Sequence, residues 1–266
     1  MKRFFVFLLL PLVGACSSVE QPRQHAPAIA DWLASSVQLF SERDGGQRRF
    51  GSGVVLALDE DGQALVATAS HVLRPDSEEK VYAIDPATSE PKEAEILAAN
   101  STTDVAILRV RNLNGRPAQL TTSARLGDEV WVVSFPWGRR GTLVNGIVSQ
   151  VAPDGTPASI PIEGPVSLID AAVSYGTSGG GVFDGRSGTL VGIVRGYRTA
   201  RLSIPGAQSA SLEFPIAGET TVVATSTILC LFAQAKLDHV LADTGGWDAA
   251  TAHCIESEGE RADASS

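Results

Sequence analysis

The sequence predicts an all-β fold, either a barrel or a sandwich, on three observations. Short apolar runs recur along the chain and are bounded by Gly, Pro or Asp, the residues that end strands and form turns. Glycine (26) and proline (14) are plentiful, as many tight turns require, and a helical period is almost absent. With 266 residues, of which 44% are hydrophobic, the chain can bury one large β domain or two small ones.

In the first half, two apolar runs flank a glycine-containing turn at residues 59–63 and predict a pair of strands. Further runs continue the series, so the predicted strands are residues 54–58, 64–68, 81–84, 94–98 and 105–110. Residues 31–40 fit either a short helix or a first strand, and the pattern leaves both open. Residues 112–122 predict a connector between two halves.

The second half has the same style, with predicted strands at residues 130–134, 143–151, 166–173 and 189–194. One helix is predicted at about 226–242, because the apolar side chains there share a face: Ile228, Leu231, Phe232 and Ala235. Residues 243–266 are small and acidic and predict a flexible tail.

The N-terminus resembles a bacterial lipoprotein signal peptide over residues 1–15. Two basic residues precede an apolar stretch, residues 4–13, that is too short to span a bilayer as a helix. Small residues then lead directly into Cys16, as in a lipobox. The resemblance implies cleavage before Cys16, lipid on that residue, and a tether over residues 16–30. The alternative is an ordinary secretory signal in which Cys16 is incidental.

The cysteines and the net charge of the chain indicate its redox compartment and the kinds of partner that it can bind. After export, Cys230 and Cys254 lie in an oxidising compartment, where a disulfide between them is plausible, although spacing does not show whether their Cβ atoms meet. The net charge is −9 and no basic run interrupts it, so we expect no nucleic-acid partner. No metal ion or cofactor is expected either.

Three local patterns predict a catalytic triad. His71 directly follows an apolar strand, Asp104 opens the strand at 105–110, and Ser178 lies in a glycine-dense turn before another strand. Each pattern alone has a structural explanation, but the order His, Asp, Ser is that of chymotrypsin-like enzymes and differs from subtilisins and α/β-hydrolases.

The residue types suit nucleophilic catalysis. A serine hydroxyl needs a base to take its proton, a neutral imidazole is such a base near neutral pH, and a carboxylate fixes the imidazole tautomer. The backbone N–H groups of Gly176 and Ser178 are the predicted oxyanion hole, because the glycines of this turn give the backbone the freedom to point both groups at one oxygen.

These motifs resemble the trypsin-like domain of the HtrA (Deg) proteases. The resemblance covers about residues 51–194 and is carried by residues 51–55, 68–72, 104–108, 135–138, 146–149, 169–173, 176–180 and 190–193. It implies a protease domain over residues 31–242 with two perpendicular antiparallel β-barrels, the first at about 31–114 and the second at about 120–224. The triad would lie in the cleft between them, and the C-terminal helix would pack on the second barrel.

The sequence differs at one point from trypsin and at another from HtrA proteases, and each difference predicts the absence of a feature. Thr177 stands where trypsin has the Asp that pairs with a newly cut N-terminus, so we expect no activation of that kind. Only a helix and a short acidic tail follow residue 215, so we expect none of the PDZ domains that HtrA proteins usually carry.

The resemblance also predicts the primary specificity pocket. One wall would be the strand at residues 190–194, ending at Val194, with the following Arg195, Gly196 and Tyr197. The other would be residues 171–175, with Ala172 where trypsin's pocket has its acid. A buried Lys or Arg of the substrate would lack a partner there, so we expect cleavage after small or medium apolar residues. Asp170 is the main threat to this expectation, because a bend could turn its carboxylate into the pocket.

The sequence thus predicts a serine endopeptidase that cleaves polypeptides of the bacterial cell envelope through an acyl-enzyme. Ser17 after the lipidated cysteine, in place of the Asp that signals inner-membrane retention, predicts an outer-membrane anchor facing the periplasm. Two alternatives stay open: a catalytically silent protease fold that serves as an envelope binding or assembly factor, and an esterase with the same triad.

Overall fold

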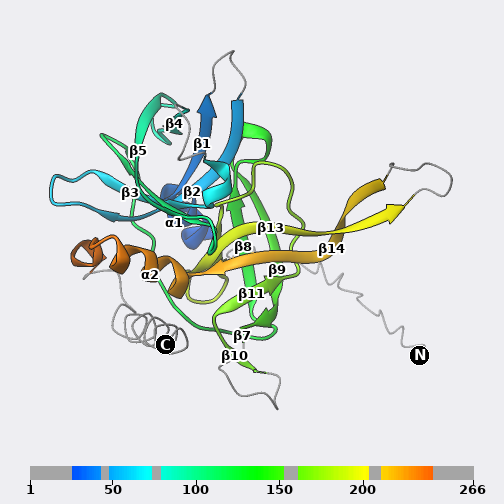
Figure 1. Cartoon of the computed structure of the whole chain (residues 1–266). Coiled ribbons are helices and arrows are strands. Elements are labelled where there is room, and N and C mark those ends of the chain that lie inside the picture. The colour runs from blue at the N-terminus through cyan, green and yellow to red at the C-terminus, as the bar shows by residue number, and fades with distance from the viewer. Residues whose placement is uncertain (1–25, 43–47, 74–78, 153–160, 204–210, 242–266) are drawn as a thin grey trace, which may run out of the picture.

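A computed structural model describes residues 26–42, 48–73, 79–152, 161–203 and 211–241. The described residues form two closed antiparallel barrels joined by a connector (Figure 1). The first barrel is β1 (Ser36–Glu42), β2 (Arg48–Leu58), β3 (Ala64–Thr68), β4 (Lys80–Ile84), β5 (Pro91–Asn100) and β6 (Val105–Val110). The second is β8 (Glu129–Ser134), β9 (Thr142–Val151), β11 (Val166–Ile169), β12 (Gly181–Asp184), β13 (Leu190–Ser203) and β14 (Ser211–Ala224). The predicted fold class is confirmed.

Shorter elements complete the described chain. The strands β7 (Ala124–Arg125) and β10 (Glu163–Gly164) pair with each other beside the second barrel. The described residues contain two α-helices, α1 (Ala26–Ser35) and α2 (Thr225–Gln234), with 3₁₀ turns η1 (Ser70–Val72), η2 (Pro136–Gly138) and η3 (Asp238–Leu241). None of the described helices is long and apolar enough to cross a membrane.

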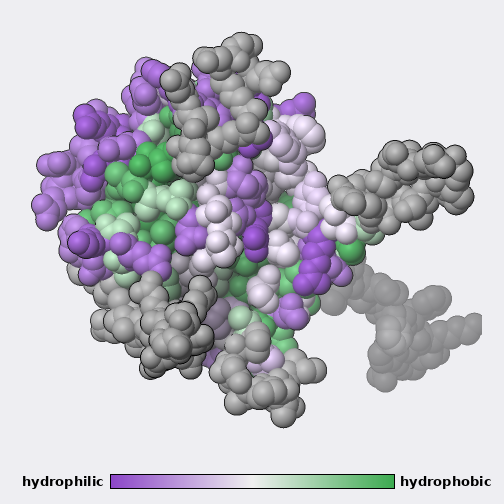
Figure 2. Space-filling view, viewed as in Figure 1, coloured by the Kyte–Doolittle hydropathy of each residue, from purple (hydrophilic) through white to green (hydrophobic). Residues whose placement is uncertain are grey.

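Each barrel has its own apolar interior, and a third cluster of buried side chains joins the barrels to the two helices. This third cluster includes Val54 and Ile107 from the first barrel, Phe183 and Ile193 from the second, and Phe232 from α2. Burial of this apolar surface favours one fixed arrangement of the two barrels. The strand β5 has no fully buried residue, and in Figure 2 apolar side chains gather in the region of β3 and β5 within a largely hydrophilic rim.

The N-terminal boundary differs from the prediction. Residues 31–40 were predicted to be either a helix or a strand, and they contain both: α1 runs to Ser35 and β1 follows it directly. The last part of the predicted tether, residues 26–30, belongs to α1, so the folded part begins earlier than expected. The cause is Trp32, which is 2% exposed, stacks on Phe183 with ring centroids 5.6 Å apart, and donates its indole N–H to the carbonyl of Gly188 (2.9 Å).

The C-terminal helix is shorter than predicted. It ends at Gln234 because Lys236 takes a left-handed conformation (φ 57°), with the N–H of Leu237 bonded back to the carbonyl of Phe232 (2.9 Å). The rest of the predicted range, up to Leu241, is the separate turn η3. Moreover, α2 contacts β5 and β6 of the first barrel as well as β13 and β14 of the second, so it bridges the barrels.

A buried carboxylate fixes the connector between the barrels. Asp85 is 0% exposed, and its Oδ1 accepts the N–H groups of Ala87 and Thr88 (both 2.9 Å). Its Oδ2 accepts the backbone N–H (2.8 Å) and the side-chain amide (3.0 Å) of Asn114 in the connector. Burial raises the pKa of a carboxyl, but the hydrogen bonds to Asn114, Thr88 and Ala87 outweigh it and lower the pKa of Asp85 to about 2.

This lowered pKa predicts an acid-dependent part of the stability. Since the pKa is 3.8 in the absence of these contacts and about 2 in the fold, the stabilisation is present above about pH 4 and is lost as the pH falls through about 2. Asp85→Asn should lower the free energy of unfolding at neutral pH by about 2 kcal/mol, and its difference from the wild type should shrink below about pH 4. Urea unfolding at stepped pH measures this, with the exposed Asp61→Asn as control. A difference that is the same at every pH would contradict the role of Asp85.

Candidate active site

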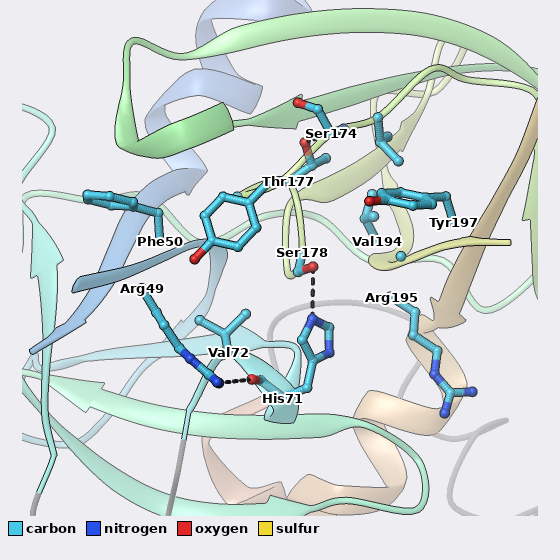
Figure 3. A pocket seen from close by; sticks show the side chains of 14 residues that line it. Arg49, Phe50, His71, Val72, Ser174, Thr177, Ser178, Val194, Arg195 and Tyr197 are labelled. Carbon is cyan, nitrogen blue, oxygen red and sulfur yellow. Dashed lines mark hydrogen bonds between the residues drawn. The ribbon is translucent and has the colours of Figure 1, made fainter. Parts of the chain in front are cut away.

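The three predicted catalytic residues lie within hydrogen-bond distance of one another. His71 Nδ1 lies 2.9 Å from Asp104 Oδ2, and His71 Nε2 lies 2.9 Å from Ser178 Oγ (Figure 3). The carboxylate therefore favours the tautomer with the proton on Nδ1, which leaves Nε2 free to accept the serine proton. His71 comes from the first barrel and Ser178 from the second, so the packing of the barrels positions the pair.

Local structure orients the acid and the base. Asp104 is 6% exposed, and its Oδ1 also accepts the backbone N–H of His71 (2.9 Å). Its own carbonyl accepts the N–H of Ser70 (3.2 Å), so η1 is bound to Asp104 at two neighbouring peptide groups. Asp104 itself has φ 61°, a left-handed conformation that Asp tolerates better than most residues but that still costs energy. The hydrogen bonds of Asp104 with His71 and Ser70 stabilise this strained conformation.

The turn before Ser178 carries the two backbone N–H groups that were predicted to form an oxyanion hole. The carbonyl of Tyr175 accepts the N–H of Trp137 (2.9 Å). Because the C=O and N–H of a trans peptide point in opposite directions, the N–H of Gly176 is directed away from Trp137. Gly176 has φ 90°, and a Cβ there would lie 2.6 Å from Trp137 N, so the position requires glycine. Among the described residues, neither Gly176 N–H nor Ser178 N–H donates to a protein acceptor.

Ser52, on β2, was not predicted as a site residue. It is 0% exposed, donates its hydroxyl to the carbonyl of Gly176 (2.8 Å), and accepts the N–H of Phe135 (2.9 Å). Its backbone N–H also donates to the carbonyl of Ser178 (2.8 Å). The motif around Ser52 was visible in the sequence, but these partners are more than 80 positions away along the chain, and no local pattern reveals them.

Thr177 closes the turn locally. It is 2% exposed, its N–H donates to the carbonyl of Ser174 (3.1 Å), and its hydroxyl accepts the N–H of Ser174 (3.3 Å). A neutral side chain with a nearby partner thus occupies the position at which trypsin has a charged one.

A cavity of about 510 Å³ opens beside the triad. From one predicted wall, its lining includes Val194, Arg195, Gly196 and Tyr197. From the other predicted wall, the lining includes Val173, Ser174 and Tyr175. Residues that were not predicted also line it: Arg49, Phe50 and Val72 (Figure 3).

The prediction that Ala172 lines this pocket is wrong. The strand β11 ends at Ile169, short of the predicted 173, and the chain then turns so that Ala171 is buried in the second barrel while Ala172 faces solvent. Asp170 is exposed and is not among the lining residues either. Its carboxylate lies close to Gly218, where a Cβ would be 2.8 Å from Asp170 Oδ1.

The remaining predicted residues lie partly outside the described ranges. No group of His, Cys, Asp and Glu among the described residues could hold a metal ion. Cys230 is disulfide-bonded. Its predicted partner, Cys254, and the predicted lipid site, Cys16, both lie outside the described residues, so these two assignments stay predictions.

Comparison with known proteins identifies the family. Residues 51–193 match the family described as "Trypsin-like peptidase domain", which is more than half of the chain. The chain belongs to the trypsin-like peptidase family. The predicted resemblance to HtrA proteases is confirmed by relatives whose names place them in that group.

Among the trypsin-like relatives, "Protease Do-like 1, chloroplastic" of Arabidopsis thaliana is 32% identical over 60% of this chain and 35% of its own length. The "Probable periplasmic serine endoprotease DegP-like" of Brucella suis biovar 1 (strain 1330) is 32% identical over 67% of this chain and 33% of its own length. The chain thus spans about a third of the length of these curated relatives.

Two solved trypsin-like structures resemble the chain. The Rv3671c protease in its inactive form is 25% identical, with a TM-score of 0.55, and the match covers 78% of this chain and 92% of that one. The HtrA-type protease AlgW with tripeptide is 21% identical, with a TM-score of 0.60, and the match covers 82% of this chain and 64% of that one. At this identity, the second likeness shows the fold alone.

The contacts of Ser52 predict that it positions the oxyanion turn. Ser52→Ala should leave the carbonyl of Gly176 and the N–H of Phe135 without a partner, at a cost of about 1–3 kcal/mol in unfolding free energy. The misplaced turn should lower kcat of peptide hydrolysis about ten- to a hundredfold with little change in KM. The matched control is Ser41→Ala, a buried serine of β1 that donates to Glu79 (2.8 Å) away from the cleft. Equal loss of kcat in both variants would contradict a positioning role for Ser52.

Proposed function

We propose that this chain is a serine endopeptidase in which Ser178 is the nucleophile, His71 the general base and Asp104 the residue that orients the base. The observation that carries the proposal is the continuous line of contacts from Asp104 through His71 to Ser178, with 2.9 Å at both junctions. Membership of the trypsin-like peptidase family supports the same chemistry.

The reaction follows from these contacts in two halves. Ser178 Oγ attacks the carbonyl carbon of the scissile peptide bond while its proton passes to His71 Nε2, and the charge on the carbonyl oxygen is stabilised by the N–H groups of Gly176 and Ser178. His71 then gives the proton to the leaving amine, and an acyl-enzyme forms on Ser178. A water molecule, deprotonated by His71, hydrolyses the ester and restores the serine.

Polypeptides of the bacterial cell envelope are the proposed substrates. The described lining of the cavity has no Asp or Glu that could pair with a buried Lys or Arg, and this supports cleavage after small or medium apolar residues. The Brucella relative is named as periplasmic, which supports an envelope location. A catalytically silent binding factor and an esterase are the competing proposals, and the aligned triad disfavours the first.

Replacement of the nucleophile tests the proposal. Ser178→Ala should lower kcat on casein by about 10⁴-fold or more, because the reaction loses its covalent route. The variant should unfold at the same urea concentration as the wild type, since the hydroxyl lies in an open cleft. Casein cleavage by the wild type alone separates the protease from the esterase and from the silent binder. Cleavage that persists in purified Ser178→Ala would show that the triad assignment is wrong.

We propose in addition that Cys16 carries lipid and anchors the protein to the outer membrane, facing the periplasm. Cys16→Ser should move the protein from the membrane fraction to the soluble periplasmic fraction in a Gram-negative host, because lipid chains are what hold a tethered domain at a bilayer. Ser18→Ala, two positions after the proposed lipid site, is the control and should stay in the membrane fraction. Intact mass of the wild-type protein should show diacylglyceryl and acyl additions at Cys16, and a soluble wild-type protein with an unmodified N-terminus would contradict the anchor.

A further inference from the structure

The cavity beside the triad is lined by two arginines and, in its described lining, by no carboxylate. This is unusual in a chain whose net charge is −9. Arg49 and Arg195 reach the cavity from different barrels, and Figure 3 shows their guanidinium groups on opposite sides of His71. Positive charge has therefore been placed where a substrate would lie, although most of the charge of the protein is negative.

Arg195 is held in place by the triad itself. Its Nε lies 3.4 Å from Asp104 Oδ2, and the Asp104 side chain is 8% exposed, whereas the Arg195 side chain is 52% exposed. A guanidinium carries five N–H donors, so an ion pair at Nε leaves the two terminal nitrogens able to donate elsewhere. Among the described residues, no carboxylate other than Asp104 lies within ion-pair distance of Arg195.

Arg49 differs from Arg195 in this respect. A terminal nitrogen of Arg49 donates to the backbone carbonyl of His71 (3.2 Å). This contact occupies one of the guanidinium donors that could otherwise bind a ligand. Arg195 is therefore the better candidate for a ligand, because its Nε is paired with a buried carboxylate and its side chain is half exposed at the cavity. Such a pre-organised fork fits a second carboxylate in a bidentate manner and loses little side-chain freedom on binding.

We propose that Arg195 binds a carboxylate side chain of the substrate, so that the cleft selects peptide segments with an acidic residue next to the scissile bond. The inference deepens the proposed function and rests on it, because it names the substrate class of the same site. It concerns a residue beside the cleaved bond and is compatible with an apolar residue in the primary pocket.

Pairs of quenched fluorescent peptides that differ only by Glu or Gln test this specificity, with the exchange placed on either side of the cleaved bond in separate pairs. In one of these pairs, the wild type should prefer Glu about tenfold in kcat/KM, the worth of one good charge-assisted hydrogen bond. The preference should fall in about 1 M salt, which screens charges over about 3 Å. The readout is the Glu-to-Gln ratio within each variant, so a general loss of activity does not affect it.

Three variants assign the preference to a residue. Arg195→Gln should bring the ratio to about one, and Arg195→Lys, which keeps the charge and loses the fork, should give an intermediate ratio. Arg186→Gln is the matched control, because it removes the same charge from an exposed turn outside the cavity and should keep the wild-type ratio. A wild-type ratio near one in every pair, or a ratio that survives Arg195→Gln, would overturn the inference.

Binding separates this inference from the proposed function. The same peptides, labelled for fluorescence anisotropy, are titrated with Ser178→Ala and with the double variant Ser178→Ala, Arg195→Gln. Tighter binding of the Glu peptide that is lost in the double variant supports the inference even if the wild type cleaves nothing, which would refute only the protease. Cleavage by the wild type without a Glu preference in binding refutes only the role of Arg195.

Discussion

The hydroxyl of Ser52 joins the first barrel to the turn that carries the nucleophile. It is buried, it donates to the carbonyl of Gly176, and it accepts the N–H of Phe135 from the second barrel. The neighbouring hydrogen bond from Trp137 to Tyr175 holds the same turn from the other side. Because a buried polar group without a partner costs free energy, these bonds leave the turn little freedom to rotate its peptide groups. The direction of the Gly176 N–H, and with it the oxyanion hole, depends on this junction.

The triad depends in turn on how the barrels are packed. The proposed base and nucleophile, His71 and Ser178, come from different barrels, and the apolar cluster shared by β2, β6, β12, β13 and α2 sets the distance between them. Asp104 is held in a strained conformation by contacts to η1, and its second oxygen also faces Arg195. One carboxylate thus orients the base and fixes an arginine of the cleft.

Local patterns in the sequence were enough for the strands of both barrels and for selecting the three residues that the fold brings together, His71, Asp104 and Ser178, because strand periodicity, turn residues and short motifs are properties of neighbouring residues. What they could not supply was contact between distant segments. Trp32 becomes part of a helix because Phe183 and Gly188 cover it, and Ala172 leaves the pocket because β11 ends at Ile169. The length of α2 was overestimated because the left-handed Lys236, which ends it, is not a residue that usually does so. The roles of Ser52 and Arg195 likewise arise only when the barrels meet.

Ser178 is proposed to be an activated nucleophile in an assembled site. Labelling of the purified wild-type protein with a fluorophosphonate at neutral pH, followed by peptide mass mapping, tests it most directly, because the reagent reacts with a serine only when a base and an oxyanion hole are in place. We expect one stoichiometric adduct, located on Ser178. A folded protein that forms no adduct, or forms it on another residue, would contradict the claim.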